Sequence, residues 1–329
     1  MNPSADTSSG ALNNRPFLSV CLNPVIQKTL VYEHIARGEV NRTSRWRLDA
    51  SGKGINVTRI LSQSGEPVIH LTQLGEPTRD WFLSMCREDG LAVEWVESGS
   101  PIRFCTTLIE TKHASATELV EEALPVAKET GSRIEARFQS LIAKARMVIL
   151  SGTVAAGFKP GLIPRLASIA SQAGVPLVLD IKKQDLLDSL PSRPLCVKPN
   201  LEELAQTIGL PYEQVKDEQA ARALVEKTGR EWYDTWGTYL VVTRGSLPTL
   251  YWSGSELREC PITPVKALNP IGSGDAFCAG LARMLAQGAS IDEAVKEGTR
   301  LGALNAIQLK PGSIACTGLH ALSRMNSLA

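Results

Sequence analysis

Hydrophobic and polar positions along the chain form two kinds of segment. Short, almost entirely apolar runs are typical of buried strands, and they occur at Phe17–Leu22, Val68–Thr72, Met147–Leu150, Val175–Asp180 and Tyr239–Thr243. Longer segments carry apolar residues three and four positions apart, which predicts amphipathic helices over Ile55–Ser64, Arg79–Glu88, Ile134–Ala145, Gly161–Gln172, Glu202–Ile208 and Glu218–Lys227. This alternation predicts an α/β fold, with a mostly parallel central sheet and helices on both faces. Ligands in such folds bind beyond the carboxyl ends of the strands.

Two segments interrupt the alternation, Val31–Leu48 and Ile102–Val120. Both have strand-like composition, but neither is long and apolar enough to supply a central strand and a crossover helix. We predict a small antiparallel sheet that stands off the main domain as a lid over the site, built from about residues 28–48 and 102–121. We expect a tail over residues 1–15 and a single domain over residues 16–329 that includes these lid segments.

Composition excludes several classes of function. The chain has 329 residues, a formal net charge of +1 and 43% hydrophobic residues, which is ordinary for a globular protein. Near-neutral charge argues against a nucleic-acid-binding or membrane-surface role. No apolar run approaches the roughly 20 residues that span a bilayer. The first fifteen residues lack the apolar stretch of a signal peptide, so we expect a disordered tail.

Cysteine and histidine spacing gives no sign of a metal site. The seven cysteines are odd in number and show no CxxC spacing, which predicts buried free thiols in a reducing cytoplasm: Cys21, Cys86, Cys105, Cys196, Cys260, Cys278 and Cys316. The four histidines lie far apart in sequence without a zinc signature: His34, His70, His113 and His320. We therefore expect structural roles for all four.

The stretch "NPIGSGDAFCAGLARML" (Asn269–Leu285) places an acid directly behind a glycine-rich turn, at the start of a segment with helical spacing. One interpretation is helix capping, because Ser and Asp favour helix N-termini. The other is an anion site, in which the N–H groups of Gly272, Ser273 and Gly274 face an anion and Asp275 does chemistry beside it.

Three further stretches are ambiguous when taken singly. "SGKGINVTRIL" (Ser51–Leu61) is either a flexible turn or an anion site at a helix start, with Lys53 between two glycines. "CVKPNLEEL" (Cys196–Leu204) predicts a capping box of Asn200 and Glu203, or an oxygen environment for Mg²⁺. "VVTRGSLPTLYW" (Val241–Trp252) predicts a hairpin whose backbone near Thr243–Gly245 could support a ligand.

In this order and spacing, the four stretches resemble the ribokinase or PfkB-type carbohydrate kinase family. The resemblance is closest to its branch of hexose-phosphate kinases, 1-phosphofructokinase and tagatose-6-phosphate kinase, and it runs from about Phe17 to about Leu319. It also includes "CLNP" (Cys21–Pro24), "GEVNR" (Gly38–Arg42), "TELVEEALPV" (Thr117–Val126), "SGTVAAGF" (Ser151–Phe158) and "LGALNAIQLKPGS" (Leu301–Ser313). The implied fold is ribokinase-like, and the implied cofactors are ATP and Mg²⁺.

The resemblance also implies residue roles. Asp275 would be the general base, and Gly272, Ser273 and Gly274 would form the anion hole for the transferring phosphoryl group. The positions that match the family's sugar site are Gln27, Gly52, Lys53, Asn56 and Arg103. Those that match its nucleotide site are Lys198, Asn200, Thr243, Gly245, Gly274 and Asn305. Asn200 and Glu203 would order magnesium through its waters.

The chain departs from the family pattern at three places. Gln27 stands where the strand-one motif usually has an aspartate that grips sugar hydroxyls, so hydroxyl preference should differ. Ser51 replaces the first glycine of the usual Gly-Gly-Lys-Gly, and Lys182 and Lys183 replace a small-residue turn after Asp180. All of these lie on or near the sugar side.

The sequence therefore predicts an ATP- and magnesium-dependent kinase that converts a ketohexose monophosphate to a bisphosphate. Two alternatives remain: a kinase of an unphosphorylated sugar or nucleoside, and a non-catalytic sugar-phosphate sensor on a kinase fold. Apolar Trp46, Phe104 and Leu108 in the lid segments suggest a homodimer through the lid sheets.

Overall fold

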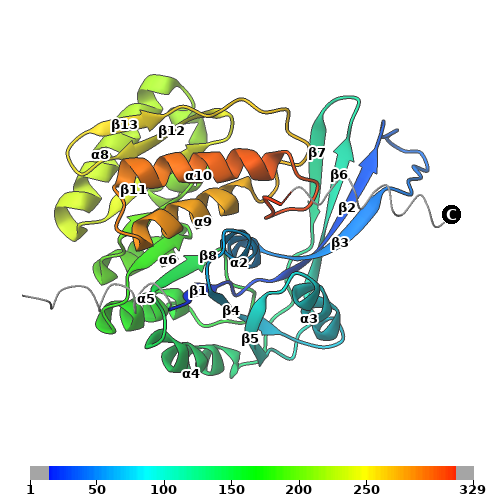
Figure 1. Cartoon of the computed structure of the whole chain (residues 1–329), viewed down its shortest axis with the longest axis horizontal. Helices are drawn as coiled ribbons and strands as arrows, with labels where there is room; N and C mark the ends of the chain where they lie inside the picture. The colour runs from blue at the N-terminus through cyan, green and yellow to red at the C-terminus, as the bar shows by residue number, and fades with distance from the viewer. Residues whose placement is uncertain (1–14, 316–329) are drawn as a thin grey trace, which may run out of the picture.

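The computed structural model describes residues 15–315. Its large sheet has the strand order β13-β12-β11-β10-β9-β8-β1-β4-β5 (Figure 1). The strands are β1 (Phe17–Val20), β4 (Val68–Leu74), β5 (Ala92–Glu97), β8 (Met147–Ser151), β9 (Leu177–Asp180), β10 (Cys196–Val197), β11 (Tyr239–Arg244), β12 (Leu247–Trp252) and β13 (Leu257–Cys260). Pairing is parallel from β5 to β11, whereas β12 and β13 are added as an antiparallel edge.

Helices cover both faces of the large sheet, as predicted. They are α2 (Lys53–Gln63), α3 (Arg79–Glu88), α4 (Thr130–Ile142), α5 (Leu162–Gln172), α6 (Lys183–Ser189), α7 (Leu201–Thr207), α8 (Glu218–Trp236), α9 (Ser273–Ala286) and α10 (Ile291–Ala306). Leu18 of β1 packs into a core with α4, α5, α7 and α8, and its neighbour Phe17 packs into a second core with α2, α9 and α10. Because successive residues of β1 enter different cores, this strand must be apolar throughout.

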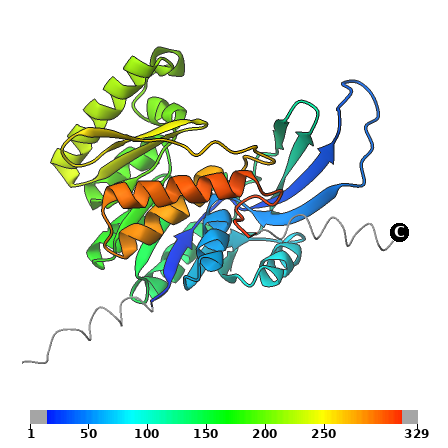
Figure 2. The ribbon, with the colours of Figure 1, turned by 45° about the horizontal axis from the view of Figure 1, so that its top comes forward.

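A separate small sheet has the order β3-β2-β6-β7, formed by β2 (Val25–Tyr32), β3 (Trp46–Ser51), β6 (Arg103–Glu110) and β7 (Ser115–Val120). Figures 1 and 2 show it projecting from the large body. The prediction of an antiparallel sheet was wrong in part, because β2 and β6 pair in parallel, while β2–β3 and β6–β7 are antiparallel hairpins. Both β2 and β6 leave the large sheet in the same direction, which makes them parallel.

The strand bounds in this sheet also differ from the prediction. Residues 33–45 form a loop, and the strands lie on either side of it. The residues that pair across β3, β2 and β6 include Trp46, Leu30 and Leu108, which places three apolar side chains side by side on one face of the sheet. Trp46 is 44% exposed. This face of the small sheet is therefore left partly uncovered by its own chain.

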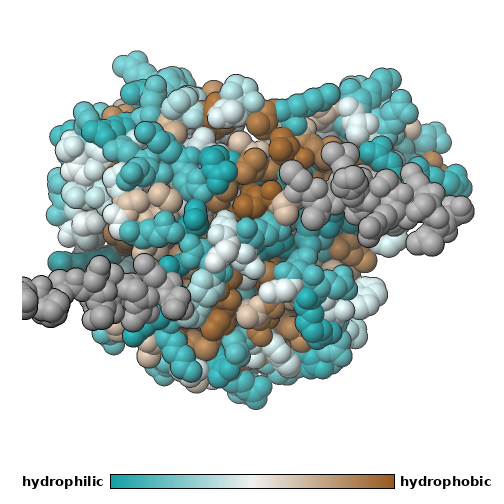
Figure 3. All heavy atoms as spheres, in the orientation of Figure 1, coloured by the Kyte–Doolittle hydropathy of each residue, from teal (hydrophilic) through white to brown (hydrophobic). Residues whose placement is uncertain are grey.

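The surface in Figure 3 is mostly hydrophilic, but hydrophobic side chains gather between the large body and the small sheet, near the end of α10. Exposed apolar residues of the segments that meet there are Val265, Leu268 and Ile307.

The remaining predictions concern the cysteines, membrane-spanning helices and the two ends of the chain. The six described cysteines are free and buried, as predicted. Within residues 15–315, no helix combines the length and the apolar character that crossing a membrane requires. Cys316, His320 and nearly all of the predicted tail lie outside the described residues.

Candidate active site

A cavity of about 390 Å³ opens at the carboxyl edge of the large sheet, beneath the small sheet. Its lining contains most of the predicted site residues, namely Gln27, Gly52, Lys53, Asn56, Arg103, Lys198, Asn200, Glu203, Thr243, Gly272, Gly274 and Asp275. Residues separated by up to 248 positions in sequence therefore converge on one space. Of the predicted site residues, Gly245, Ser273 and Asn305 are not part of this lining.

The glycine-rich turn leads directly into α9. Gly272 has a left-handed backbone (φ 83°), and a Cβ there would meet the Gly312 nitrogen at 2.5 Å, so only glycine fits. The Ser273 N–H donates to the Pro270 carbonyl at 3.1 Å, which turns this amide away from an anion. The next two amides, of Gly274 and Asp275, belong to the open first turn of the helix, where N–H groups lack intrahelical partners.

Asn305 stabilises this turn through side-chain hydrogen bonds. The side chain is fully buried, and its Nδ2 donates to the Ile271 carbonyl at 2.9 Å and to the Ser273 hydroxyl at 3.1 Å. Its Oδ1 accepts from the Ser313 N–H at 3.0 Å. In this structure Asn305 holds the glycine-rich turn in shape, and it does not border the cavity.

Asp275 lies at the base of the cavity and is 7% exposed. Its Oδ2 accepts a hydrogen bond from Asn56 Nδ2 at 2.8 Å. Burial raises the pKa of Asp275 to about 6; the nearby Lys53 ammonium opposes that shift, and the Asp180 carboxylate adds to it. A carboxylate with a pKa close to neutrality is suited to proton transfer at physiological pH.

Asn56 is itself held in a fixed orientation. Its Oδ1 accepts from the Ser51 hydroxyl and from Arg59 Nη1, both at 3.2 Å. Arg59 is 1% exposed and is fixed by Asp89 and by the carbonyls of Ala50 and Pro311. Because the guanidinium of Arg59 can only donate, the amide oxygen of Asn56 must face it, and the amide nitrogen must face Asp275. Ser51, which departs from the family pattern, therefore helps to orient the partner of Asp275.

Four charged side chains form a cluster beside Asp275. Asp180 Oδ1 lies 3.4 Å from Lys53 Nζ and 3.2 Å from Lys198 Nζ, and Lys53 Nζ lies 3.1 Å from Glu203 Oε1. Burial alone would raise the pKa of Asp180, but the two lysines outweigh it and lower that pKa. Burial alone would lower the pKa of Lys53, but Asp180 and Glu203 outweigh it and raise that pKa. Asp180 and Lys53 are consequently both charged at neutral pH.

Asn200 and Glu203 form the predicted capping box at the start of α7. The Glu203 N–H donates to Asn200 Oδ1 at 2.8 Å, and the Asn200 N–H donates to Glu203 Oε2 at 3.0 Å. The same two side chains border the cavity together with Asp180. Capping and cavity lining are therefore compatible, and the three side chains supply the oxygen donors that Mg²⁺ prefers.

The opposite wall of the cavity comes from the small sheet. Gln27 is 2% exposed, and its Nε2 donates to the Thr107 hydroxyl at 2.7 Å. Arg103 Nη1 donates to the Glu121 carbonyl at 2.9 Å, whereas its buried Nε has no hydrogen-bond partner among residues 15–315. Glu118 of β7 also borders the cavity; burial raises its pKa, and the charge of Arg103 opposes that shift.

Sequence reasoning missed two acidic residues of the site, Asp180 and Glu118. Asp180 had a usable signal, because it ends the apolar run "VPLVLD" and so falls at the carboxyl edge of the sheet. Glu118 had none: it reaches the cavity through the register of β7 against β6, in which it pairs with Thr107.

The turn after Asp180 departs from the family pattern in a physically informative way. Lys183 has a left-handed backbone (φ 59°), a conformation that favours glycine, and its N–H donates to the Thr207 hydroxyl at 2.8 Å. Lys182 borders an adjoining cavity of about 150 Å³, whose lining also includes Lys53 and Arg103. This turn therefore keeps the shape of a small-residue turn while adding positive charge near the site.

Comparisons with known structures agree with this fold. Phosphofructokinase-2 from Escherichia coli in complex with fructose-6-phosphate superposes with a TM-score of 0.79 and 20% identity, covering 94% of this chain and 99% of that chain. A Thermotoga maritima protein described as a possible 1-phosphofructokinase gives a TM-score of 0.79 and 18% identity, covering 94% and 97%. The tetrameric inhibited form of the Escherichia coli phosphofructokinase-2 gives 0.80 and 20%, covering 94% and 100%.

At these identities the structural matches show the fold, which is the ribokinase-like fold predicted from the sequence. The family assignment rests on the sequence match: the pfkB family of carbohydrate kinases matches residues 20–316, nearly the whole described chain. The chain belongs to the pfkB family and is a carbohydrate kinase.

Proposed function

We propose that this kinase transfers the γ-phosphoryl group of ATP to a hydroxyl of a sugar phosphate, converting a ketohexose monophosphate to a bisphosphate. The observation that carries the proposal is Arg103. It borders both cavities on the small-sheet side, and its buried Nε lacks a partner among the described residues, so a bound anion would satisfy it. Lys53 adds a second positive charge to both linings.

The proposed chemistry needs one base and a place for negative charge. Asp275 accepts the proton of the attacking hydroxyl, whose oxygen forms a bond to the γ-phosphorus while the bond to the β–γ bridging oxygen breaks and ADP leaves. Asn56 keeps the carboxylate oriented through its 2.8 Å hydrogen bond. The amides of Gly274 and Asp275 stabilise charge on the transferring group, because they lie at the positive end of α9.

The residues beside Asp275 fit a magnesium site. Asn200 and Glu203 would hold Mg²⁺ through water, and the ion would neutralise charge on the ATP phosphates. Thr243 lies beside Asn200, to which it is joined by an isolated parallel bridge, so it is well placed to contact the nucleotide. Gly245 would contact the nucleotide from the β11–β12 turn, and Asn305 would act on it indirectly through the turn that it holds.

Three other features belong to the same proposal. Two of the residues predicted for a dimer contact, Trp46 and Leu108, lie on one apolar face with Leu30 between them, and this face would pair with a second copy of the chain, giving a homodimer through the lid sheets. The third, Phe104, packs against a core cluster of its own chain. The six buried free thiols suit a reducing cytoplasm. Glu118 would face the hydroxyls of the acceptor.

The two alternatives predict different behaviour. A kinase of unphosphorylated sugars or nucleosides would not need Arg103, and a non-catalytic sensor would not need Asp275 at all. The hydrogen-bonded arrangement of Asp275 and Asn56 favours a catalyst over a sensor.

The decisive experiment measures ADP release with Mg²⁺ and ATP against a panel of ketose and aldose monophosphates, free sugars and nucleosides. We expect turnover with at least one ketohexose monophosphate and little with the free sugars. Faster turnover of an unphosphorylated acceptor would support the first alternative. Sugar-phosphate binding without ADP release would support the sensor.

A further inference from the structure

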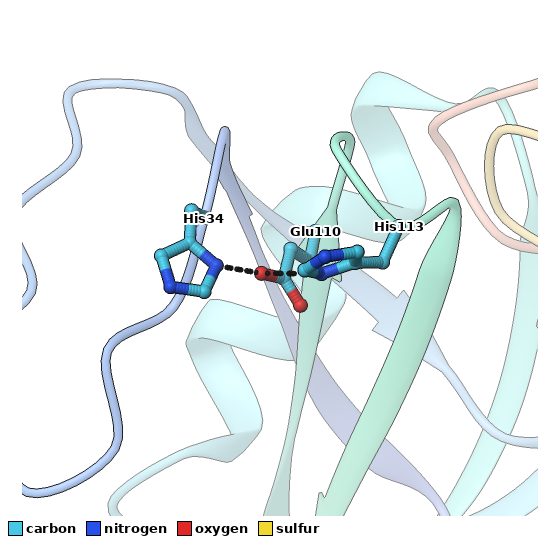
Figure 4. Close-up of side chains that lie close together, drawn as sticks. All are labelled: His34, Glu110 and His113. Atoms are coloured by element: carbon cyan, nitrogen blue, oxygen red, sulfur yellow. Dashed lines mark hydrogen bonds and ion pairs between the residues drawn. The ribbon is translucent and has the colours of Figure 1, made fainter.

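Two of the four histidines meet at the far end of the small sheet, although 79 positions separate them. His34 follows β2, and His113 lies in the turn between β6 and β7; both face Glu110 at the end of β6 (Figure 4). The parallel pairing of β2 with β6 places Tyr32 opposite Glu110, which brings the two chain segments together. One ligand atom from each of the three side chains lies within 4.8 Å of the other two.

The arrangement has the dimensions of a metal-ion site. His113 Nδ1 lies 3.0 Å from Glu110 Oε1, and His34 Nδ1 contacts the same oxygen. Ligands at about 2.0–2.1 Å from a tetrahedral ion are about 3.3 Å apart, so small adjustments would admit an ion between these atoms. The two imidazole rings lie 5.7 Å apart at an interplanar angle of 81°, so they approach the common point from different directions.

The carboxylate is held in place by a group outside this set. The Ile35 N–H donates to Glu110 Oε1 at 3.0 Å, and this bond, followed by those from the two histidines, lowers the pKa of Glu110. Glu110 is 14% exposed, whereas His34 and His113 are 52% and 55% exposed. A fixed carboxylate with two solvent-accessible imidazoles leaves room for water as a fourth ligand.

We propose that His34, Glu110 and His113 form a binding site for a divalent transition-metal ion of the zinc class, with solvent completing the coordination. Imidazole nitrogen favours zinc and its neighbours over Mg²⁺, which prefers oxygen, so the kinase's own magnesium would not compete. The ion would join the loop after β2 to the turn between β6 and β7. It would therefore tie the two hairpins of the small sheet together, away from the catalytic cavity.

The alternative is an ion-paired triad in which Glu110 simply accepts from two histidines. The two differ in what they bind, because an ion pair needs protonated imidazole whereas a metal ion needs neutral imidazole. The test is therefore binding of Zn²⁺ itself at pH 7.5, with excess Mg²⁺ present and a non-thiol reductant to keep the cysteines reduced.

Isothermal titration of the full chain should show one Zn²⁺ site that is lost or weakened at least roughly tenfold in His34→Ala and in His113→Ala, since even supporting partners of metal ligands are worth ten- to a hundredfold in affinity. His34→Asn is the matched variant, because an amide N–H can still donate to Glu110 but cannot replace imidazole as a ligand. It should lose zinc and keep its thermal stability without metal.

A second measurement reports on geometry. Co²⁺ should give visible absorption typical of four-coordinate nitrogen and oxygen ligation in the wild type, and this signal should disappear in His113→Ala. If no zinc binds, or if it binds the three variants as tightly as the wild type, the proposal is overturned. Unchanged kinase turnover in zinc-free His113→Ala would confirm that the variant is folded.

Discussion

The two walls of the cavity are built in opposite ways. On the large-sheet side, Asp275, Asn56, Asp180 and Lys198 are each at most 7% exposed, and each is hydrogen-bonded or ion-paired to another member of the wall. On the small-sheet side, Arg103 has a buried nitrogen without a partner among the described residues, and Gln27 makes one side-chain hydrogen bond, to Thr107.

From this difference we infer that the two sheets have separate roles. In the proposed mechanism, phosphoryl transfer depends on groups that are fixed before the substrate arrives, and the large sheet would supply them from elements packed in two cores. Recognition of the acceptor would depend on groups whose hydrogen-bonding capacity is still open, and the small sheet would supply those. We therefore expect substitutions on the large-sheet side (the first wall) to abolish catalysis. Substitutions on the small-sheet side (the second wall) should change substrate preference.

Asp275→Asn tests the first wall and should cause the largest loss of activity. We expect kcat to fall by roughly 10²–10⁴-fold, because the proposed general base is lost while the amide oxygen can still accept from Asn56. Steady-state kinetics at saturating ATP and sugar phosphate measure this. The matched control is Asp292→Asn, which alters an aspartate in the first turn of the neighbouring helix α10, outside the cavity. If the two variants lose activity equally, Asp275 serves the helix and not the reaction.

Arg103→Met should weaken the second wall. A hydrogen bond to a charged group is worth about 1.5–3 kcal/mol, so KM for the sugar phosphate should rise by roughly 10- to 150-fold with a smaller change in kcat. Arg45→Met, an exposed arginine of the loop before β3, controls for loss of positive charge in the small sheet. An unchanged KM in Arg103→Met would contradict a phosphorylated acceptor and would favour a free sugar or nucleoside.

Gln27→Asp tests the small-sheet side, because it introduces the carboxylate that the family resemblance implies at this position. A buried polar group left unpaired costs about 1–3 kcal/mol, which corresponds to roughly 5- to 150-fold in kcat/KM between isomers. We expect the variant to gain activity on fructose 1-phosphate or tagatose 6-phosphate and to lose it on its natural acceptor. The measurement is kcat/KM for both proteins over a panel of ketose and aldose monophosphates.

Thr107→Val is the control for Gln27→Asp, since it removes the hydrogen-bond partner of Gln27 without adding charge. Efficient turnover of fructose 1-phosphate by the wild type, at about 10⁵ M⁻¹s⁻¹ or better, together with a poorer Gln27→Asp variant, would refute this role for Gln27.

The same contrast explains what could be predicted from the sequence. The inner strands of the large sheet are mostly buried on both faces, so they appear as continuous apolar runs, and β1, β4, β8, β9 and β11 were all predicted to within a few residues. The small sheet is buried on one face only, and its pattern is weaker. Its composition predicted strands, but the parallel pairing of β2 with β6 depends on where the chain leaves the large sheet, which no local pattern contains.

The site divides in a similar way. Glycine-rich turns into helices gave the positions of Lys53, Asn56 and Asp275, because their chemistry is local. Glu118 and the meeting of His34 with His113 depend on strand register between distant segments, so sequence spacing could not predict them. Asn305 was predicted to lie near the nucleotide, but its buried contacts with the turn could be seen only in the fold.

The smallest effect that we predict is a pH-dependent stability of the first wall. The pKa of Asp275 is raised to about 6 by burial, above its ordinary value near 3.8, so ionising it costs the folded state free energy that is absent at low pH. Asp275→Asn removes this cost. The variant should therefore become more stable relative to wild type as pH rises, by roughly 1–2 kcal/mol between pH 5 and pH 8, as measured by urea unfolding at each pH.

Asp292 provides a control of opposite sign, because the hydrogen bond from Tyr251 lowers its pKa. Asp292→Asn should therefore lose relative stability as pH rises through the acid range. Equal, flat pH dependences for the two variants would mean that Asp275 has an ordinary pKa and is not the pre-set base that the first wall requires.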